Sequence, residues 1–195
     1  YRCRKNFFNR NVINIYSYNY LYFSFTNGKS NTNGISTVGL PNYFCNFRLS
    51  NGSLVNVQIM DTAGQEAYRA INASYCKKAD CCLLVYDISN RQSFEECKTY
   101  YNEMIKEKCP NNVKVIVLGN KTDLEDKREV PFSEGSYFSF ENHYIFMETS
   151  CLKNERVFEA FTTLIEITIR EALKNNEKVK GDNITIKNEQ NNKRE

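Results

Sequence analysis

The 195-residue chain has no tryptophan, only three prolines and a single histidine, and it contains no long uninterrupted hydrophobic run. No stretch approaches the roughly 18 consecutive apolar residues of a membrane-spanning helix, and residues 1–5 are not followed by the apolar core of a signal peptide. The formal net charge is only +3 and the basic residues are spread along the chain, so we expect no nucleic-acid partner. Length and composition predict one soluble, unsecreted domain with tails.

The eight cysteines include no C-x-x-C pair, which argues against both a zinc site and a disulfide framework. Cys81 and Cys82 are adjacent in an apolar run, where a strand would point them to opposite faces as small hydrophobic side chains. Unpaired cysteines are typical of a reducing compartment, so we expect a cytoplasmic protein. The chain begins with Tyr1 rather than methionine, and we interpret it as a fragment or an incomplete gene model.

From residue 43 onward, strand-like and helix-like segments alternate. Residues 43–49 and 55–60 alternate in polarity around Asn51-Gly52, which is a strong hairpin signal. Three apolar runs predict buried strands, at residues 81–86, 113–118 and 144–147. Helices are expected over residues 93–108, from Ser133, and over residues 155–173, where apolar residues recur at spacings of three and four.

This alternation predicts an α/β fold with a doubly wound, mostly parallel sheet and helices on both faces. Ligands of such sheets bind at the carboxyl ends of the strands, so functional side chains should directly follow strands. Beyond residue 173 the composition becomes rich in Lys, Asn, Glu and Gln. Because this segment cannot bury enough apolar surface to fold, we expect a disordered polar tail over residues 175–195.

The segment Asp61-Thr62-Ala63-Gly64-Gln65-Glu66 directly follows one predicted strand. The carboxylate of Asp61 can hold a magnesium ion, and the amide of Gly64 can approach a γ-phosphate because no Cβ blocks it. Gln65 can then orient the attacking water. An ordinary acidic turn is the alternative for D-x-x-G alone, whereas the full six residues are more specific.

A second polar segment, Asn120-Lys121-Thr122-Asp123, follows another predicted strand. The carboxylate of Asp123 can accept two hydrogen bonds from N1 and N2 of guanine, which adenine cannot offer. The stem of Lys121 can cover the ring face, and Asn120 can tie neighbouring loops together. A solvated turn is the alternative for these four residues alone. A third loop, containing Ser150 and Cys151, can offer a backbone amide to the guanine carbonyl.

In order and spacing these segments resemble the Ras superfamily of small GTPases, most closely the Rab family, over about residues 35–173. Asp61 and Asn120 are 59 positions apart, and Asn120 and Ser150 are 30 positions apart, both similar to that family. Further Rab-like stretches occur at residues 74–80 and 84–89 and at Ser93-Phe94.

The resemblance implies the small GTPase fold, with a six-stranded sheet, and a molecular switch that binds GTP or GDP and hydrolyses GTP in vesicle-mediated transport. It implies Mg²⁺ as cofactor, held by Thr37 and Asp61, and Gln65 as the catalytic residue. The nucleotide-binding residues would be Thr37, Asp61, Gly64, Asn120, Lys121, Asp123, Ser150 and Cys151. The implied partners are effectors, exchange factors and a GTPase-activating protein that supplies an arginine.

The sequence departs from the family at its amino end, where a strand and the phosphate loop G-x-x-x-x-G-K-[ST] are expected. Gly28-Lys29-Ser30 is the one similar stretch, but Phe23 stands where the first glycine belongs. Only seven positions separate Ser30 from Thr37, too few for the intervening helix. We therefore expect the first strand and phosphate loop to be degenerate or missing, although residues 20–25 have strand-like composition.

We interpret residues 1–34 as an atypical segment, such as untranslated or intronic sequence in the gene model, preceding a GTPase domain at 35–174. One alternative is a pseudo-GTPase or truncated product that acts only as a protein-binding module, and another is a fragment that does not fold.

Cys151 and Leu152 replace the usual alanine and lysine of the third loop. No cysteine follows Cys151, so we expect only indirect membrane association of this chain, with the cytosolic face of endomembranes as its location if the native protein is lipidated. His143 is expected to be structural.

Overall fold

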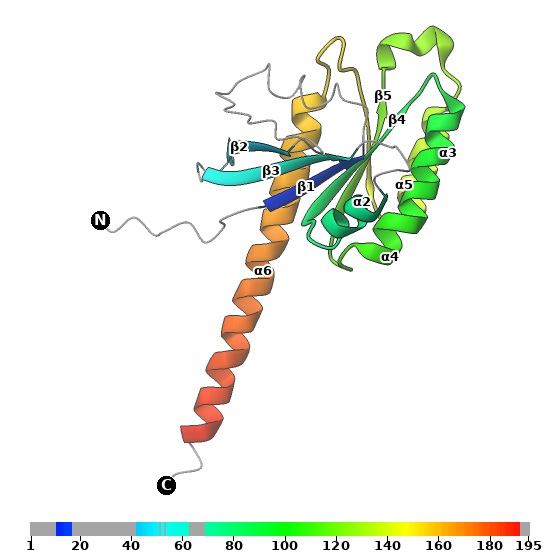
Figure 1. Ribbon diagram of the computed structural model, residues 1–195. Helices are drawn as coiled ribbons and strands as arrows, with labels where there is room; N and C mark the ends of the chain where they lie inside the picture. Colours follow the sequence, from blue (N-terminus) through cyan, green and yellow to red (C-terminus); the bar gives the residue numbers. More distant parts are fainter. Residues whose placement is uncertain (1–10, 17–41, 51, 53, 63–68, 192–195) are drawn as a thin grey trace.

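The computed structural model describes residues 11–16, 42–50, 52, 54–62 and 69–191. Within this part of the chain, one sheet has the strand order β2-β3-β1-β4-β5-β6 (Figure 1). Only β2 and β3 pair antiparallel, and the other neighbours are parallel. The strands are β1 (Asn11–Tyr16), β2 (Asn42–Arg48), β3 (Leu54–Thr62), β4 (Cys81–Asp87), β5 (Lys114–Asn120) and β6 (Ile145–Thr149).

The hairpin predicted around Asn51-Gly52 is confirmed, since β2 and β3 pair directly. Gly52 has φ +83°, a conformation that glycine adopts without the strain a Cβ would bring, and its amide donates to the carbonyl of Leu49 at 2.9 Å. Val55 and Val57 are buried, whereas Asn56 between them is exposed. This alternation fixes the register because a shift by one residue would expose the valines.

The first strand, expected to be degenerate or missing, is present as β1. β1 lies within the segment that was set apart from the domain, and it occupies the middle of the sheet between β3 and β4. Its sequence, NVINIY, combines β-branched and aromatic residues, which favour a strand once neighbours are present on both sides. Six residues within an Asn-rich context are too short to establish a periodicity. Residues 20–25, the strand candidate by composition, lie outside the described residues.

The three buried strands predicted from apolar runs are confirmed as β4, β5 and β6, with ends shifted by a few residues. Cys81 packs with the core on one face of the sheet and Cys82 with the core on the other, as expected for adjacent strand residues. Leu83 and Leu84 divide between the faces in the same way. A central strand that is buried on both faces needs apolar residues at every position, which explains the continuous run.

Helices cover both faces of the sheet. α6 (Val157–Asn191) packs on the face that includes Cys81, through Phe161, Leu164 and Ile165. The opposite face is covered by α2 (Arg69–Cys76), α3 (Arg91–Tyr100), the π-helical segment η2 (Tyr101–Ile105) and α5 (Phe132–Glu141), with α4 (Lys106–Lys108) continuing η2 and the 3₁₀ helix η3 (Thr122–Lys127) following β5. The helix predicted over residues 93–108 is therefore present but contains one π turn.

α6 continues well beyond the predicted end at residue 173, and its C-terminal part projects past the sheet (Figure 1). The helix is described to Asn191, beyond residue 175, where the composition predicts a disordered polar tail; that expectation stays a prediction. A polar composition excludes burial in a core, but helical hydrogen bonds are local and require no core. No helix in the described part of the chain is long and apolar enough to cross a membrane.

Candidate functional site

The carboxyl ends of three neighbouring strands bring polar residues into line. In the register of the sheet, Asp87 at the end of β4 lies beside Asn120 at the end of β5, which lies beside Thr149 at the end of β6. Parallel strands end at the same edge, so residues 33 and 29 positions apart in sequence become neighbours. The loops that follow β5 and β6 contain the other candidate residues.

Asn120 ties these two loops together, as the sequence analysis expected of this side chain. Its Oδ1 accepts hydrogen bonds from the hydroxyl of Thr149 and from the amide of Cys151, both at 3.3 Å. Both bonds are at the long end of the range for hydrogen bonds. The amide of Cys151, which the sequence analysis predicts to bind a guanine carbonyl, therefore donates to Asn120 in this structure.

A second link joins the same loops. The hydroxyl of Ser150 donates to Oδ1 of Asp123 and in turn accepts from the amide of Lys153 at 3.1 Å. Ser150 is completely buried, and its backbone pairs with Glu155 in both directions, which fixes the position of its hydroxyl. This bond uses Oδ1 of Asp123, and no other described residue bonds its second oxygen, so the carboxylate is held in place with one oxygen available to a ligand.

Lys121 is anchored by a carboxylate that the sequence analysis did not select. Its Nζ lies 2.5 Å from Oδ2 of Asp87, whose side chain is 11% exposed. Ser89 also donates to Asp87, from its amide at 2.9 Å and its hydroxyl at 2.7 Å. Burial acts to raise the pKa of Asp87, but the hydrogen bonds from Lys121 and Ser89 outweigh it and hold that pKa below its usual range. The sequence signal was present, since Asp87 ends a buried strand.

Arg128 links the η3 loop to β6 and was also missed by the sequence analysis. Its guanidinium forms two parallel hydrogen bonds to Glu148, at 2.7 and 3.0 Å, and two to Glu125, one of which is 2.8 Å long. The hydrogen bonds from these two carboxylates raise the pKa of Arg128. The pair connects the end of η3 to β6, directly before Thr149. No sequence pattern links residues 20 positions apart in this way.

The remaining predicted residues fall wholly or partly outside the part of the chain that the structure describes. Thr37, Gly64 and Gln65 lie outside the described residues, as does the side chain of Asp61. The backbone of Asp61 lies near the end of β3, in register with Ile15 of β1. Among the described residues, no cluster of three or more acidic, histidine or cysteine side chains could hold a metal ion.

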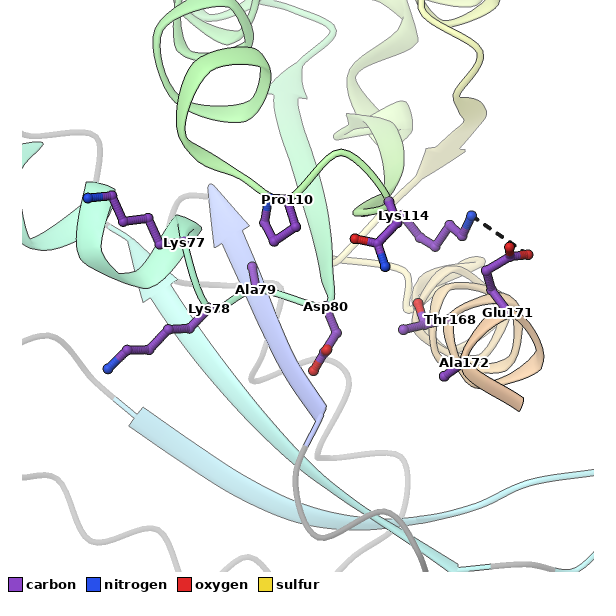
Figure 2. A pocket seen from close by; sticks show the side chains of 10 residues that line it. Lys77, Lys78, Ala79, Asp80, Pro110, Lys114, Thr168, Glu171 and Ala172 are labelled. Atoms are coloured by element: carbon purple, nitrogen blue, oxygen red, sulfur yellow. Dashed lines mark ion pairs between the residues drawn. The ribbon is translucent and has the colours of Figure 1, made fainter. Parts of the chain in front are cut away.

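A hollow of about 250 Å³ lies at the other end of β4 and β5 and contains several charged residues. Figure 2 shows that Lys77 and Lys78 extend away from it, while Lys114 points toward Glu171. The Nζ of Lys114 lies 3.9 Å from a carboxylate oxygen of Glu171. These charges do not converge on a common point, so this hollow is not a candidate anion site.

A doubly wound, mostly parallel sheet with polar loops at the ends of β5 and β6 is typical of nucleotide-binding α/β proteins. Comparison with known sequences is more specific. The model of the Ras family matches residues 19–170, which begins within the segment 1–34 and includes Gly28-Lys29-Ser30.

Curated relatives are Rab proteins. Ras-related protein Rab-17 of Mus musculus is 38% identical over 141 residues, which is 72% of this chain and 65% of Rab-17. Ras-related protein Rab-8B of Homo sapiens is 38% identical over 144 residues, which is 74% of this chain and 69% of Rab-8B. Ras-related protein Rab-4B of Rattus norvegicus is 46% identical over 110 residues, which is 56% of this chain and 51% of Rab-4B. The chain belongs to the Ras family of small GTPases and is most like its Rab members.

Proposed function

We propose that this chain is a Rab-like GTPase that binds GTP and GDP and acts as a switch in vesicle-mediated transport. The observation that supports it best is the double link between the β5 and β6 loops. Asn120 holds the backbone of Cys151, and Ser150 holds the carboxylate of Asp123. Preorganised polar groups at a strand end favour recognition of a base edge, because no ordering of the loop is then required on binding.

Guanine suits the chemistry of this loop. The free oxygen of Asp123, together with the one bonded to Ser150, can accept from N1 and N2 of guanine. The stem of Lys121 can lie along the ring while its ammonium stays with Asp87. The hydrogen bond from the amide of Cys151 to Asn120 is long, at 3.3 Å. This amide can therefore donate to the guanine carbonyl instead when the base binds.

Hydrolysis is the second part of the proposal. Thr37 and Asp61 supply oxygen donors of the kind that Mg²⁺ prefers, and the ion would neutralise charge on the β- and γ-phosphates. Gly64 would donate its amide to the γ-phosphate, and Gln65 would position the attacking water. Effectors, exchange factors and activating proteins would recognise the states that result, at the cytosolic face of endomembranes.

The test uses the full chain with fluorescent GDP and GTP analogues, in the presence of Mg²⁺, with ATP as competitor. We expect binding that ATP does not displace, because an adenine leaves the Asp123 carboxylate without donors. Asp123→Asn should weaken GDP binding by about a hundredfold, since a charge-assisted pair of hydrogen bonds is lost. It should improve binding of xanthosine diphosphate, whose carbonyl at position 2 can accept from the new amide. Asp126→Asn, in the same 3₁₀ helix and exposed, is the matched control.

A pseudo-GTPase that serves only as a protein-binding module is the second candidate, favoured by the absence of a complete G-x-x-x-x-G-K-[ST] pattern. Single-turnover GTP hydrolysis separates the two. A GTPase should lose most of its turnover in Gln65→Leu while keeping nucleotide affinity, and Lys29→Ala should lower affinity if Gly28-Lys29-Ser30 contacts phosphate. A cooperatively folded chain that binds no nucleotide would contradict the GTPase proposal and favour the binding module.

A further inference from the structure

A second cleft, of about 480 Å³, lies at the beginning of β5 and β6, at the opposite end of these strands from Asn120 and Thr149. β5 is seven residues long, so its two ends are about 20 Å apart. The volume falls within the range of about 300 to 1,000 Å³ that is typical of small-molecule sites. A ligand in this cleft would therefore not compete for the loops that follow the strands.

Apolar side chains form one part of the wall of the cleft, beside polar ones such as Asn111 and Asn142. Tyr101 and Tyr144 pack edge to face with their ring centroids 5.7 Å apart. Aliphatic side chains complete this part of the wall, from Ile105, Val113, Val115, Ile145 and Ile167. Ile145 is the first residue of the edge strand β6, and its large apolar side chain is 38% exposed to solvent. Such a wall suits an apolar body that displaces water.

The π turn forms one side of the cleft. η2 inserts a turn of wider helix between α3 and α4, and its first and last residues, Tyr101 and Ile105, both line the cleft. A π turn widens the helix at a cost in regular hydrogen bonding, and such turns are found frequently at functional sites. The widened turn is thus a second feature, independent of volume, that marks this location.

The charges that line the cleft have one sign. No aspartate or glutamate is among its lining residues, whereas Lys106 and Lys114 are. Lys114 is engaged by Glu171 at 3.9 Å. Lys106 is exposed and forms no ion pair with any other residue that the structure describes. One uncompensated cation at the edge of an apolar wall is complementary to a single negative charge on an apolar body.

We propose that this cleft binds an amphipathic anion of the fatty-acid class, with its hydrocarbon chain against Tyr101, Tyr144 and Ile145 and its carboxylate at Lys106. The apolar wall supplies affinity through burial of the chain, and Lys106 supplies the preference for an anion. This site is separate from the proposed nucleotide site, and it does not depend on guanine binding.

The test is a titration of the full chain with decanoate, below its micelle concentration, followed by amide chemical shifts and by calorimetry. We expect saturable shifts that cluster at Tyr101, Val113 and Tyr144. Decanol, which has the same chain without the charge, should bind about tenfold more weakly, and decylammonium more weakly still.

Two variants test the assignment. Lys106→Met should weaken decanoate about tenfold and leave decanol unchanged, whereas Lys108→Met, exposed in the same short helix and outside the cleft, should change neither. Ile145→Glu should abolish decanoate binding by placing a like charge on the wall. If Ile145→Glu fails to fold, Lys106→Met still tests the proposal, because an exposed lysine can be replaced without loss of the fold. Equal affinity for decanol and decanoate, shifts that map elsewhere, or no saturable binding would each overturn the proposal.

Discussion

Removal of the Arg128 guanidinium should destabilise the domain more than any nearby surface substitution. In Arg128→Met, the carboxylate of Glu148 loses the two hydrogen bonds, of 2.7 and 3.0 Å, that the guanidinium donates, while methionine keeps most of the apolar stem of the side chain. The two side chains are 17% and 13% exposed, so the carboxylate is left largely desolvated without a counter-charge. Breaking a fully buried pair typically costs about 3 to 5 kcal/mol, and partial solvation should reduce this to about 2 to 3 kcal/mol.

The assay is urea denaturation followed by circular dichroism, with thermal unfolding as a second measurement. A loss of about 2 to 3 kcal/mol should lower the midpoint of thermal unfolding of a chain of this size by about 5 to 10 °C. Arg128→Lys should rescue little, because an ammonium cannot form the parallel pair of hydrogen bonds. Lys127→Met, the exposed neighbour, is the control and should change stability by less than about 0.5 kcal/mol.

A double-mutant cycle isolates the pair. If the two side chains stabilise each other, Glu148→Gln should cost much less in an Arg128→Met background than in the parent chain, with a coupling free energy above about 1 kcal/mol. Additive effects, or an Arg128→Met chain that unfolds at the same urea concentration as the parent, would refute the argument that this ion pair holds η3 to β6.

Three further outcomes follow from the structure. Gly135→Ala should lower stability by about 1 to 3 kcal/mol in urea denaturation, because the added Cβ would lie 2.2 Å from the hydroxyl of Tyr86. Burial raises the pKa of the Cys81 thiol to about 12, so at pH 8 a disulfide reagent should label it at least about a hundredfold more slowly in the folded chain than in urea, by mass spectrometry. The pKa of Asp87 is lowered in the folded state, so its bond with Lys121 should stabilise the fold fully above the unfolded pKa of about 4 and progressively less as the pH falls through the folded pKa. The difference in stability between the parent and Asp87→Asn should therefore shrink in acid. A difference that stays constant with pH would contradict this.

Much of the fold was predictable because its signals are local. The Asn51-Gly52 turn and the alternating residues around it define the β2–β3 pair, and that pair forms as expected. The apolar runs locate β4, β5 and β6. Because successive side chains of a strand point to opposite faces, Cys81 and Cys82 lie on opposite faces of the sheet. The first strand was not predictable, since Asn11–Tyr16 becomes recognisable only between β3 and β4.

The site divides in the same way. The sequence by itself determined that Asn120, Lys121 and Asp123 follow a strand and that a polar loop with Ser150 follows the next, because motif and strand end adjoin in the chain. Only the tertiary structure decided that Asp87 anchors Lys121 and that Arg128 joins Glu148, because parallel strands bring together side chains that no local pattern connects. The cleft at the start of β5 and β6 also forms only in the tertiary structure, because its lining comes from the π turn, the beginnings of two strands and α6.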